Sequence, residues 1–284
     1  MDKNFFVKTH GLGNEYIVLD SENINFELSN PIIERICNVH FGIGSDGILL
    51  KAPSSKADFK LRIFNPDGSE AEKSGNGLRI FSKYLYDYKF AKTKTFTIET
   101  LGGIVTSHVV EERNGKALVI KVDMGKANFI AAEIPVKWPG EECYGETLEN
   151  KGRKFLMHCV SVGNPHCVIL MDHLDEAEIK EFGSLIENHT MFPNRINVQF
   201  VKVNSRTEVE ALIWERGACF TLASGSSSSA IASAMVKKGL TDRDLTVKML
   251  GGSLRLEIDP DWSIRMTGEV KEVASGYLSD ELFY

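Results

Sequence analysis

The sequence has few cysteines, no long apolar run and no excess of basic residues. Its five cysteines among 284 residues are sparse and odd in number, so no disulfide framework is indicated. No apolar stretch approaches the roughly 20 residues of a membrane-spanning helix, and the first residues resemble a strand rather than a signal peptide. The formal net charge is −6, whereas nucleic-acid binding requires a clustered basic surface. We therefore expect a soluble, cytoplasmic protein that binds neither membranes nor nucleic acids.

What the sequence does contain is a long-range internal repeat. In segment 65–75 a polar residue follows an apolar pair, and Ser74-Gly75 comes nine positions later, before a helix-like run. Segment 215–225 repeats this pattern around Ser224-Gly225, 150 positions further on (224 − 74). Two shorter matches lie at nearly the same offset: Gly13-Asn14 with Gly163-Asn164, and Gly102-Gly103 with Gly251-Gly252. Three matches in one order predict two similar halves that face one another.

The chain length suits two domains of ordinary size. We place the first at residues 1–124, with 270–284 returning to it, and the second at 125–269. Strands are expected over 5–20 and 157–170 (each a pair around a glycine loop), and over 48–51, 59–64, 96–110, 117–124, 197–203, 208–214 and from 245 onward. Helices are expected over 31–39, after Ser74, over 174–189 and over 230–238. The charged, glycine-punctuated stretch 138–153 is predicted to be a long surface loop.

The helix after Ser74 is apolar over most of its circumference, which predicts a sheet wrapped around it. If each half places its Ser-Gly pair at the start of such a helix, two helix N-termini point into the space between the halves. Helix N-termini offer unpaired N–H groups and a partial positive charge, which suit a substrate carboxylate. Four amides lie on or beside predicted loops, and Glu215-Arg216 supplies both charges needed for a zwitterion. These amides belong to Asn14, Asn65, Asn164 and Asn197. The ligand predicted for this site is an amino acid.

Several motifs, in order from about residue 6 to residue 268, resemble those of the diaminopimelate epimerase family. They are His10-Gly-Leu-Gly-Asn14, Gly42-Ile-Gly-x-Asp46, Phe64-Asn65-x-Asp-Gly-Ser-Glu70, Ser74-Gly-Asn-Gly77, Gly163-Asn-Pro-His166, Phe192-Pro-x-Arg-x-Asn197 and Glu215-Arg-Gly217. The resemblance implies an α/β (α+β) fold of two pseudo-symmetric domains, each a mixed β-sheet wrapped around a central helix. It also implies a homodimer that converts LL-diaminopimelate to the meso form without a cofactor, in lysine and peptidoglycan precursor synthesis.

The resemblance also implies roles for individual residues. Ser74 and Ser224 occupy the acid/base positions, and His166 and Glu215 lie beside the reacting atoms. Two further groups would bind substrate. Gly75, Asn76, Gly225 and Ser226 would hold the carboxylate at the reacting centre, and Asn14, Asn65, Asn164, Asn197, Glu215 and Arg216 would hold the rest of the molecule.

The chain departs from the family at the two acid/base positions, where the family has cysteine. A thiol has a pKa near 8.5, and a helix N-terminus lowers it, whereas a serine hydroxyl is a far weaker acid. Loss of one positioned acid or base typically costs about 10²–10⁴-fold in rate. Three explanations compete: a deliberate double substitution, a natural relative whose chemistry uses other groups, and a natural non-catalytic amino-acid binder. We favour the first, because the surrounding motifs are intact and cysteine-to-serine exchange changes shape least.

Simpler interpretations stand beside these. Ser74 and Ser224 are good helix N-caps, the asparagines can be turn residues, His166 can be an ordinary loop histidine, and Glu215-Arg216 can be a rim ion pair.

A serine hydrolase is disfavoured because neither serine lies in G-x-S-x-G. Residues 42–47 match G-x-G-x-x-G, but a strand rather than a helix should follow, so a tight loop is the better interpretation. The adjacent pairs His158-Cys159 and His166-Cys167 do not have zinc-site spacing, so no metal is expected. Cys219 is disfavoured as a replacement for the acid/base thiol at position 224, because it lies five residues before Ser224.

Overall fold

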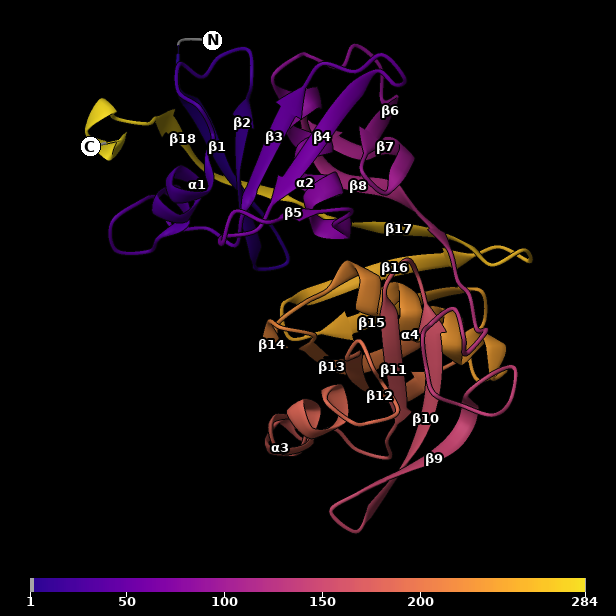
Figure 1. The fold of residues 1–284 in the computed structure, drawn as a ribbon. Coiled ribbons are helices and arrows are strands. Elements are labelled where there is room, and N and C mark those ends of the chain that lie inside the picture. Colours follow the sequence, from indigo (N-terminus) through magenta and orange to yellow (C-terminus); the bar gives the residue numbers. More distant parts are fainter. Residues whose placement is uncertain (1–2, 284) are drawn as a thin grey trace. The chain divides into compact units, whose positions relative to one another are not determined.

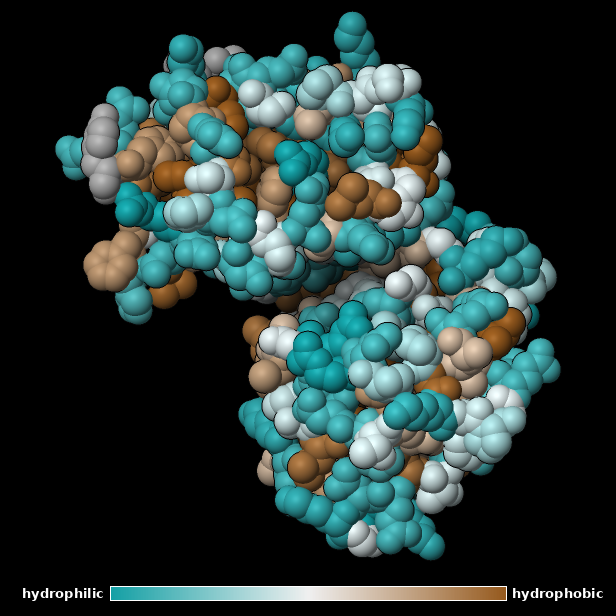
Figure 2. Space-filling model, in the orientation of Figure 1, coloured by the Kyte–Doolittle hydropathy of each residue, from teal (hydrophilic) through white to brown (hydrophobic). Residues whose placement is uncertain are grey.

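The computed structural model describes residues 3–283 and divides the chain into two compact units (Figure 1). The first unit comprises the chain up to Val122 together with the residues from Thr267 onward, and the second comprises Asp123–Met266. No helix in residues 3–283 combines the length and apolar character needed to cross a membrane. Hydrophilic side chains cover most of the visible face of each unit, and hydrophobic ones occur in small groups (Figure 2).

The first unit is a sheet wrapped around one helix. Its elements are β1 (Phe5–Gly11), β2 (Asn14–Asp20), α1 (Asn30–Cys37), β3 (Ile48–Ala52), β4 (Phe59–Phe64), β5 (Glu70–Ala71), α2 (Gly75–Asp87), β6 (Thr95–Thr100), β7 (Gly103–Arg113), β8 (Lys116–Lys126), β18 (Lys271–Tyr277) and a 3₁₀ turn, η1 (Asp280–Phe283). The strands pair in the order β18–β1–β2–β3–β4–β6–β7–β8, with β2/β3 and β4/β6 parallel.

Helix α2 is buried along nearly its whole length, as its apolar circumference predicts. Leu78, Phe81 and Leu85 are completely buried. The Val270 amide donates a hydrogen bond to the Leu118 carbonyl of β8, so the segment that leads into β18 meets the opposite end of the sheet. The sheet therefore encloses α2, and burial of the helix on all sides is the main source of its stability.

The second unit repeats this plan. Its elements are β9 (Tyr144–Asn150), β10 (Arg153–Ser161), β11 (Pro165–Leu170), α3 (Glu176–Glu187), β12 (Asn197–Ser205), β13 (Glu208–Glu215), β14 (Cys219–Thr221), α4 (Gly225–Lys237), β15 (Asp244–Met249) and β16 (Gly252–Ile258), followed by β17 (Ser263–Glu269). The strands pair in the order β9–β10–β11–β12–β13–β15–β16, with β11/β12 and β13/β15 parallel. Helix α4 packs against β10, β11, β12, β15 and β16.

The strand registers confirm the internal repeat. Ile17 lies opposite Ile48 in the first unit, and Cys167 lies opposite Val198 in the second. Likewise the pair Ile63–Ala71 corresponds to the pair Ile213–Thr221. Each partner is displaced by 150 positions (167 − 17 and 213 − 63). The two units therefore repeat one arrangement over most of their strands, and the predicted fold class is confirmed.

Three local predictions are wrong. Residues 138–153 are not one loop, because β9 forms there and pairs with β10. Leu148 is buried in this strand, but the polar residues around it obscure the strand pattern in the sequence. The predicted strand 96–110 is two strands with a turn at Leu101-Gly102. Helix α4 begins at Gly225, five residues before the predicted start, because its serines have small side chains that fit the enclosed position. They also bond back to the helix carbonyls, as Ser229 does to Gly225.

Candidate active site

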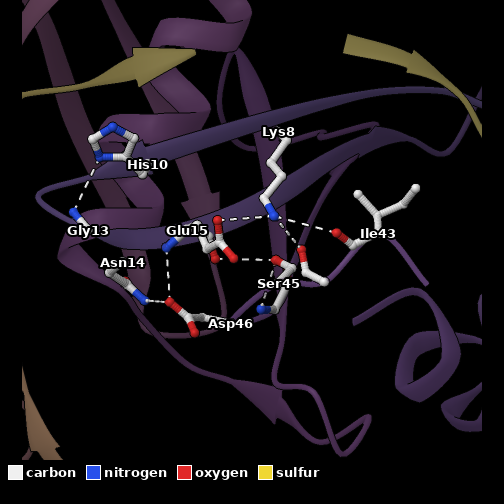
Figure 3. A network of polar contacts seen from close by, with 10 residues as sticks. Lys8, His10, Gly13, Asn14, Glu15, Ile43, Ser45 and Asp46 are labelled. Atoms are coloured by element: carbon white, nitrogen blue, oxygen red, sulfur yellow. Dashed lines mark hydrogen bonds and ion pairs between the residues drawn. The ribbon is translucent and has the colours of Figure 1, made fainter. Parts of the chain in front are cut away.

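The first unit presents Asn14 at the turn between β1 and β2, held by a polar network (Figure 3). The Asp46 carboxylate accepts hydrogen bonds from the Asn14 side-chain amide (2.8 Å) and from the Glu15 backbone amide (2.9 Å). The Lys8 ammonium donates to the Gly44 carbonyl (2.8 Å) and pairs with the Glu15 carboxylate (3.1 Å). The glycine loop 42–47 therefore holds the β1–β2 turn in place through these contacts. A strand follows the loop, not a nucleotide-binding helix.

The network continues from Asn14 into helix α2. The Asn14 Oδ1 accepts a hydrogen bond from the Asn76 amide (3.0 Å), and the Asn76 Oδ1 accepts one from the Arg79 guanidinium (2.8 Å). Arg79 is completely buried, and burial lowers its pKa to about 9, which leaves the group charged at neutral pH. A fixed positive charge therefore lies one turn inside the helix N-terminus, where it adds to the attraction of that terminus for anions.

Ser74 is the N-cap of α2, as the simpler interpretation predicts. Its hydroxyl oxygen accepts a hydrogen bond from the Gly77 amide at 3.0 Å. The phenol oxygen of Tyr16 lies 3.5 Å from the same hydroxyl. Gly75 and Asn76 are the first two helical residues. Asn65 lies in a turn, where its amide donates to the Ser69 hydroxyl at 2.9 Å, so it stands outside the Asn14–Asn76 network.

The second unit caps α4 in the same way, but with a carboxylate beside the serine. Ser224 is 4% exposed, and its hydroxyl oxygen accepts from the Ser227 amide at 3.3 Å. The same hydroxyl donates to the Glu215 carboxylate at 3.0 Å. This pair can pass a proton, because the carboxylate is positioned to receive the hydroxyl hydrogen. Gly225 and Ser226 are the first two helical residues.

His166 is held between two amides. One ring nitrogen, Nδ1, lies 3.0 Å from the Gln199 amide nitrogen, and the other, Nε2, lies 2.9 Å from the Asn164 side-chain oxygen. An amide nitrogen only donates, so Nδ1 accepts and Nε2 carries the hydrogen. The Asn164 amide in turn reaches the Ser226 hydroxyl at 3.4 Å. Asn164 is thus oriented by His166, as Asn14 is by Asp46.

The His166 ring is neutral at neutral pH. Its side chain is completely buried, and desolvation together with the nearby charge of Arg216 lowers its pKa to about 3. A ring with this pKa is uncharged near pH 7, and its two nitrogens orient the amides of Asn164 and Gln199. Gln199, which also donates to the Ser227 hydroxyl at 3.1 Å, escaped sequence analysis. The available signal was Gln199 itself, an uncharged polar residue within the apolar run 198–201.

Asn197 and Arg216 are joined through the backbone. The buried Asn197 side chain donates to the Pro165 carbonyl (2.8 Å) and accepts from the Arg216 amide (2.9 Å), so both ends of its amide brace the loops around it. The Arg216 guanidinium donates to the Asn194 carbonyl at 3.0 Å. Asn197 therefore fixes the loop that carries Arg216.

The native thiols offer no ready acid or base in the second unit's core. Cys143 and Cys159 are buried. A side-chain hydrogen bond with Cys159, together with burial, raises the pKa of Cys143, and a hydrogen bond with Cys167, together with burial, raises the pKa of Cys159. Cys219 is exposed and lies opposite Glu215 in the β13–β14 pair. Within residues 3–283, His, Cys, Asp and Glu side chains form no group of three suited to a metal ion.

Comparison with known proteins places the chain in a family. The sequence model described as diaminopimelate epimerase matches residues 6–130 and 158–273. The chain is 49% identical to diaminopimelate epimerase 2 of Nostoc sp. over 98% of its own length and 96% of that protein. It is 43% identical to diaminopimelate epimerase of Methanococcus maripaludis over 95% of its length and 98% of that protein.

Two solved structures share the fold at low sequence identity. A hydroxyproline epimerase from Agrobacterium vitis gives a TM-score of 0.73 at 11% identity, over 96% of this chain and 90% of that one. A PhzF-family protein from Bacillus anthracis gives 0.70 at 17% identity, over 98% and 100%. The family match covers most of the sequence and the repeated strand–helix plan accompanies it, so the chain belongs to the diaminopimelate epimerase family.

Proposed function

We propose that the protein epimerises LL-diaminopimelate to meso-diaminopimelate in the cytoplasm, without a cofactor, by a two-base proton transfer. The group at position 74 and the group at position 224 act on opposite faces of the same α-carbon. The observation that carries this proposal is that each of these residues caps the central helix of its own unit, in a chain up to 49% identical to named members of the family. Helix N–H groups favour negative charge on whichever atom stands at the cap.

The substrate would be held by the groups around each cap. Gly75, Asn76, Gly225 and Ser226 would bind the carboxylate at the reacting carbon, because they open the two helices. Asn14, Asn65, Asn164, Asn197 and Arg216 would hold the remainder of the molecule. Glu215 would serve Ser224 as proton acceptor, whereas His166 would orient Asn164.

Serine at both positions is expected to slow the reaction. The hydroxyl is a much weaker acid than a thiol, so little alkoxide is available near neutral pH. The chain would therefore be a weakened or silenced form of the enzyme. A second candidate, a non-catalytic amino-acid binder, is favoured by the same observation, because a hydroxyl that only caps a helix leaves the binding groups intact.

Restoring the thiols separates the two candidates. The variants Ser74→Cys, Ser224→Cys and their combination would be incubated with LL-diaminopimelate in deuterated water, and α-proton exchange followed by NMR. An epimerase gains exchange in the combined variant, by about 10²–10⁴-fold or more over the unaltered chain. The matched control is Ser184→Cys, on an exposed position of α3, which should leave exchange unchanged. Binding by calorimetry without exchange in the combined variant would establish the binder instead.

We also propose a homodimer, as the family resemblance implies. The outward side chains of β18 include Val273 and Tyr277, which are 58% and 56% exposed, and apolar groups on a strand favour pairing with another chain. Analytical ultracentrifugation of Val273→Lys should show a shift toward monomer relative to the unaltered chain. An unchanged dimer would exclude this strand as the interface.

A further inference from the structure

Tyr16 is a buried aromatic residue beside one of the two acid/base positions. It lies on β2, two residues after Asn14, and is 7% exposed. Its ring packs against Gly47, where an added Cβ would come within 2.9 Å of the ring carbon Cε1. The ring is therefore fixed in place, with its phenol oxygen 3.5 Å from the Ser74 hydroxyl.

The repeat gives this residue a counterpart. Tyr16 precedes Ile17, and His166 precedes Cys167, and these two following residues occupy equivalent strand registers. The two rings nevertheless have different partners. The His166 nitrogens are both occupied by amide groups, whereas the Tyr16 phenol reaches the helix cap itself. The two units thus differ in what adjoins the cap: a phenol at position 74 and the Glu215 carboxylate at position 224.

This difference has a direct consequence for proton affinity. A carboxylate beside an acid disfavours its ionised form, whereas a hydrogen-bond donor beside it favours that form. The phenol can donate to an anion at position 74, in addition to the Gly77 amide. The separation of 3.5 Å is long for an O–H···O bond, whose usual length is about 2.7–2.8 Å. A larger sulfur atom at the cap would narrow this gap.

We propose that Tyr16 is a positioning residue for the acid/base group at position 74, to whose anion its phenol donates a hydrogen bond. The proposal rests on the proposed epimerase function and deepens it. It makes the two caps unequal, with position 74 the stronger acid and position 224 the stronger base. Lys8, Glu15, Asp46 and Arg79 belong to the polar network around Asn14 and Asn76, and Lys73 precedes Ser74 in the chain. These charged groups are the same in every variant described below.

The test measures the acidity of a thiol introduced at position 74. The variant Ser74→Cys is compared with Ser74→Cys combined with Tyr16→Phe, which keeps the ring and removes only the hydroxyl. Alkylation by iodoacetamide is followed from pH 5 to 10 by mass spectrometry of the peptide that contains position 74. Loss of the phenol should raise the thiol pKa by about one unit, a roughly tenfold loss of thiolate at lower pH. The exposed thiol of Cys219 is the internal reference and should not change.

Equal thiol pKa values in the two variants, with Cys219 also unchanged, would overturn the proposal. A second measurement requires no change at Tyr16. The Ser74→Cys variant is labelled with ¹³C-tyrosine, and the NMR chemical shift of the Tyr16 Cζ carbon is followed against pH. This shift should change with the ionisation of the introduced thiol. A flat shift would overturn the proposal even if Tyr16→Phe failed to fold. Neither measurement needs substrate. If the pKa of the thiol at position 74 shifts but the double-cysteine variant shows no α-proton exchange, the role of Tyr16 is therefore retained and the proposed epimerase function is rejected.

Discussion

Acidification should destabilise the second unit, because it contains two buried neutral histidines. His158 and His166 are both completely buried. Burial lowers the pKa of His158 to about 4 and that of His166 to about 3, from an ordinary value of 6.5. Both folded-state pKa values lie below the unfolded value, so the unfolded chain binds more protons below pH 6.5. Stability is therefore retained above pH 6.5 and lost as the pH falls toward the folded-state values.

The size of the effect follows from these shifts. At pH 5 the solution lies about 1.5 pH units below the pKa of an unfolded imidazole, so the histidines of the unfolded chain are protonated. Each folded ring remains mostly neutral at the same pH. At 1.36 kcal/mol per unit this is roughly 2 kcal/mol for each histidine and about 4 kcal/mol for both. The free energy of unfolding of a typical domain is only about 5–15 kcal/mol, so the second unit should lose a large fraction of its stability between pH 7 and pH 5.

The chain carries its own reporter for this unit. Its three tryptophans, Trp138, Trp214 and Trp262, all belong to the second unit. Urea unfolding followed by tryptophan fluorescence at pH 7, 6 and 5 therefore reports that unit without contribution from tryptophan in the other. The free energy of unfolding should fall by about 4 kcal/mol over this range.

Substitution identifies the groups responsible. His158→Gln and His166→Gln should each remove about half of the pH dependence, whatever they do to stability at pH 7. His173→Gln, an exposed histidine of the same unit, is the matched control and should retain the full dependence. If both buried-site variants kept the same loss of stability from pH 7 to pH 5 as the unaltered chain, the reasoning from burial would be refuted.

Three further predictions concern the framework of the site. Asp87→Asn should lower the free energy of unfolding by about 3–5 kcal/mol, measured by urea unfolding, because it leaves the buried Lys83 ammonium without its carboxylate at 2.7 Å; a loss below about 1 kcal/mol would contradict this. Gly42→Ala should destabilise the first unit, because its Cβ would meet a backbone carbonyl of α1 at 2.0 Å; an unchanged melting temperature would contradict it. Gln199→Glu should reverse the His166 tautomer and raise its pKa, since a carboxylate accepts from Nδ1 and favours the charged ring; ¹⁵N shifts that stay the same would exclude this.

Much of the fold could be predicted from the sequence because the signals are local. The predicted strand 59–64 has the same bounds as β4, and the predicted helix 31–39 overlaps α1 along most of its length. The repeat predicted from three short matches is confirmed by the strand registers. The failure at 138–153 is equally instructive. Strand β9 is polar at most positions and is stabilised by its pairing with β10, so its own residues gave little indication of it.

In the candidate site, too, some features depend on local sequence and others on tertiary contacts. That Ser74 and Ser224 cap the two central helices follows from local sequence, because an N-cap is fixed by the residues within one turn. The partners of those serines do not follow from it. Tyr16 and Glu215 reach them from other elements, and the charge state of His166 depends on how completely the packed strands exclude water. Sequence alone indicated the repeated plan and the two serines as candidate helix caps. Tertiary structure decided which groups face those serines and which buried groups stay neutral, because burial and hydrogen bonding depend on residues distant in the chain.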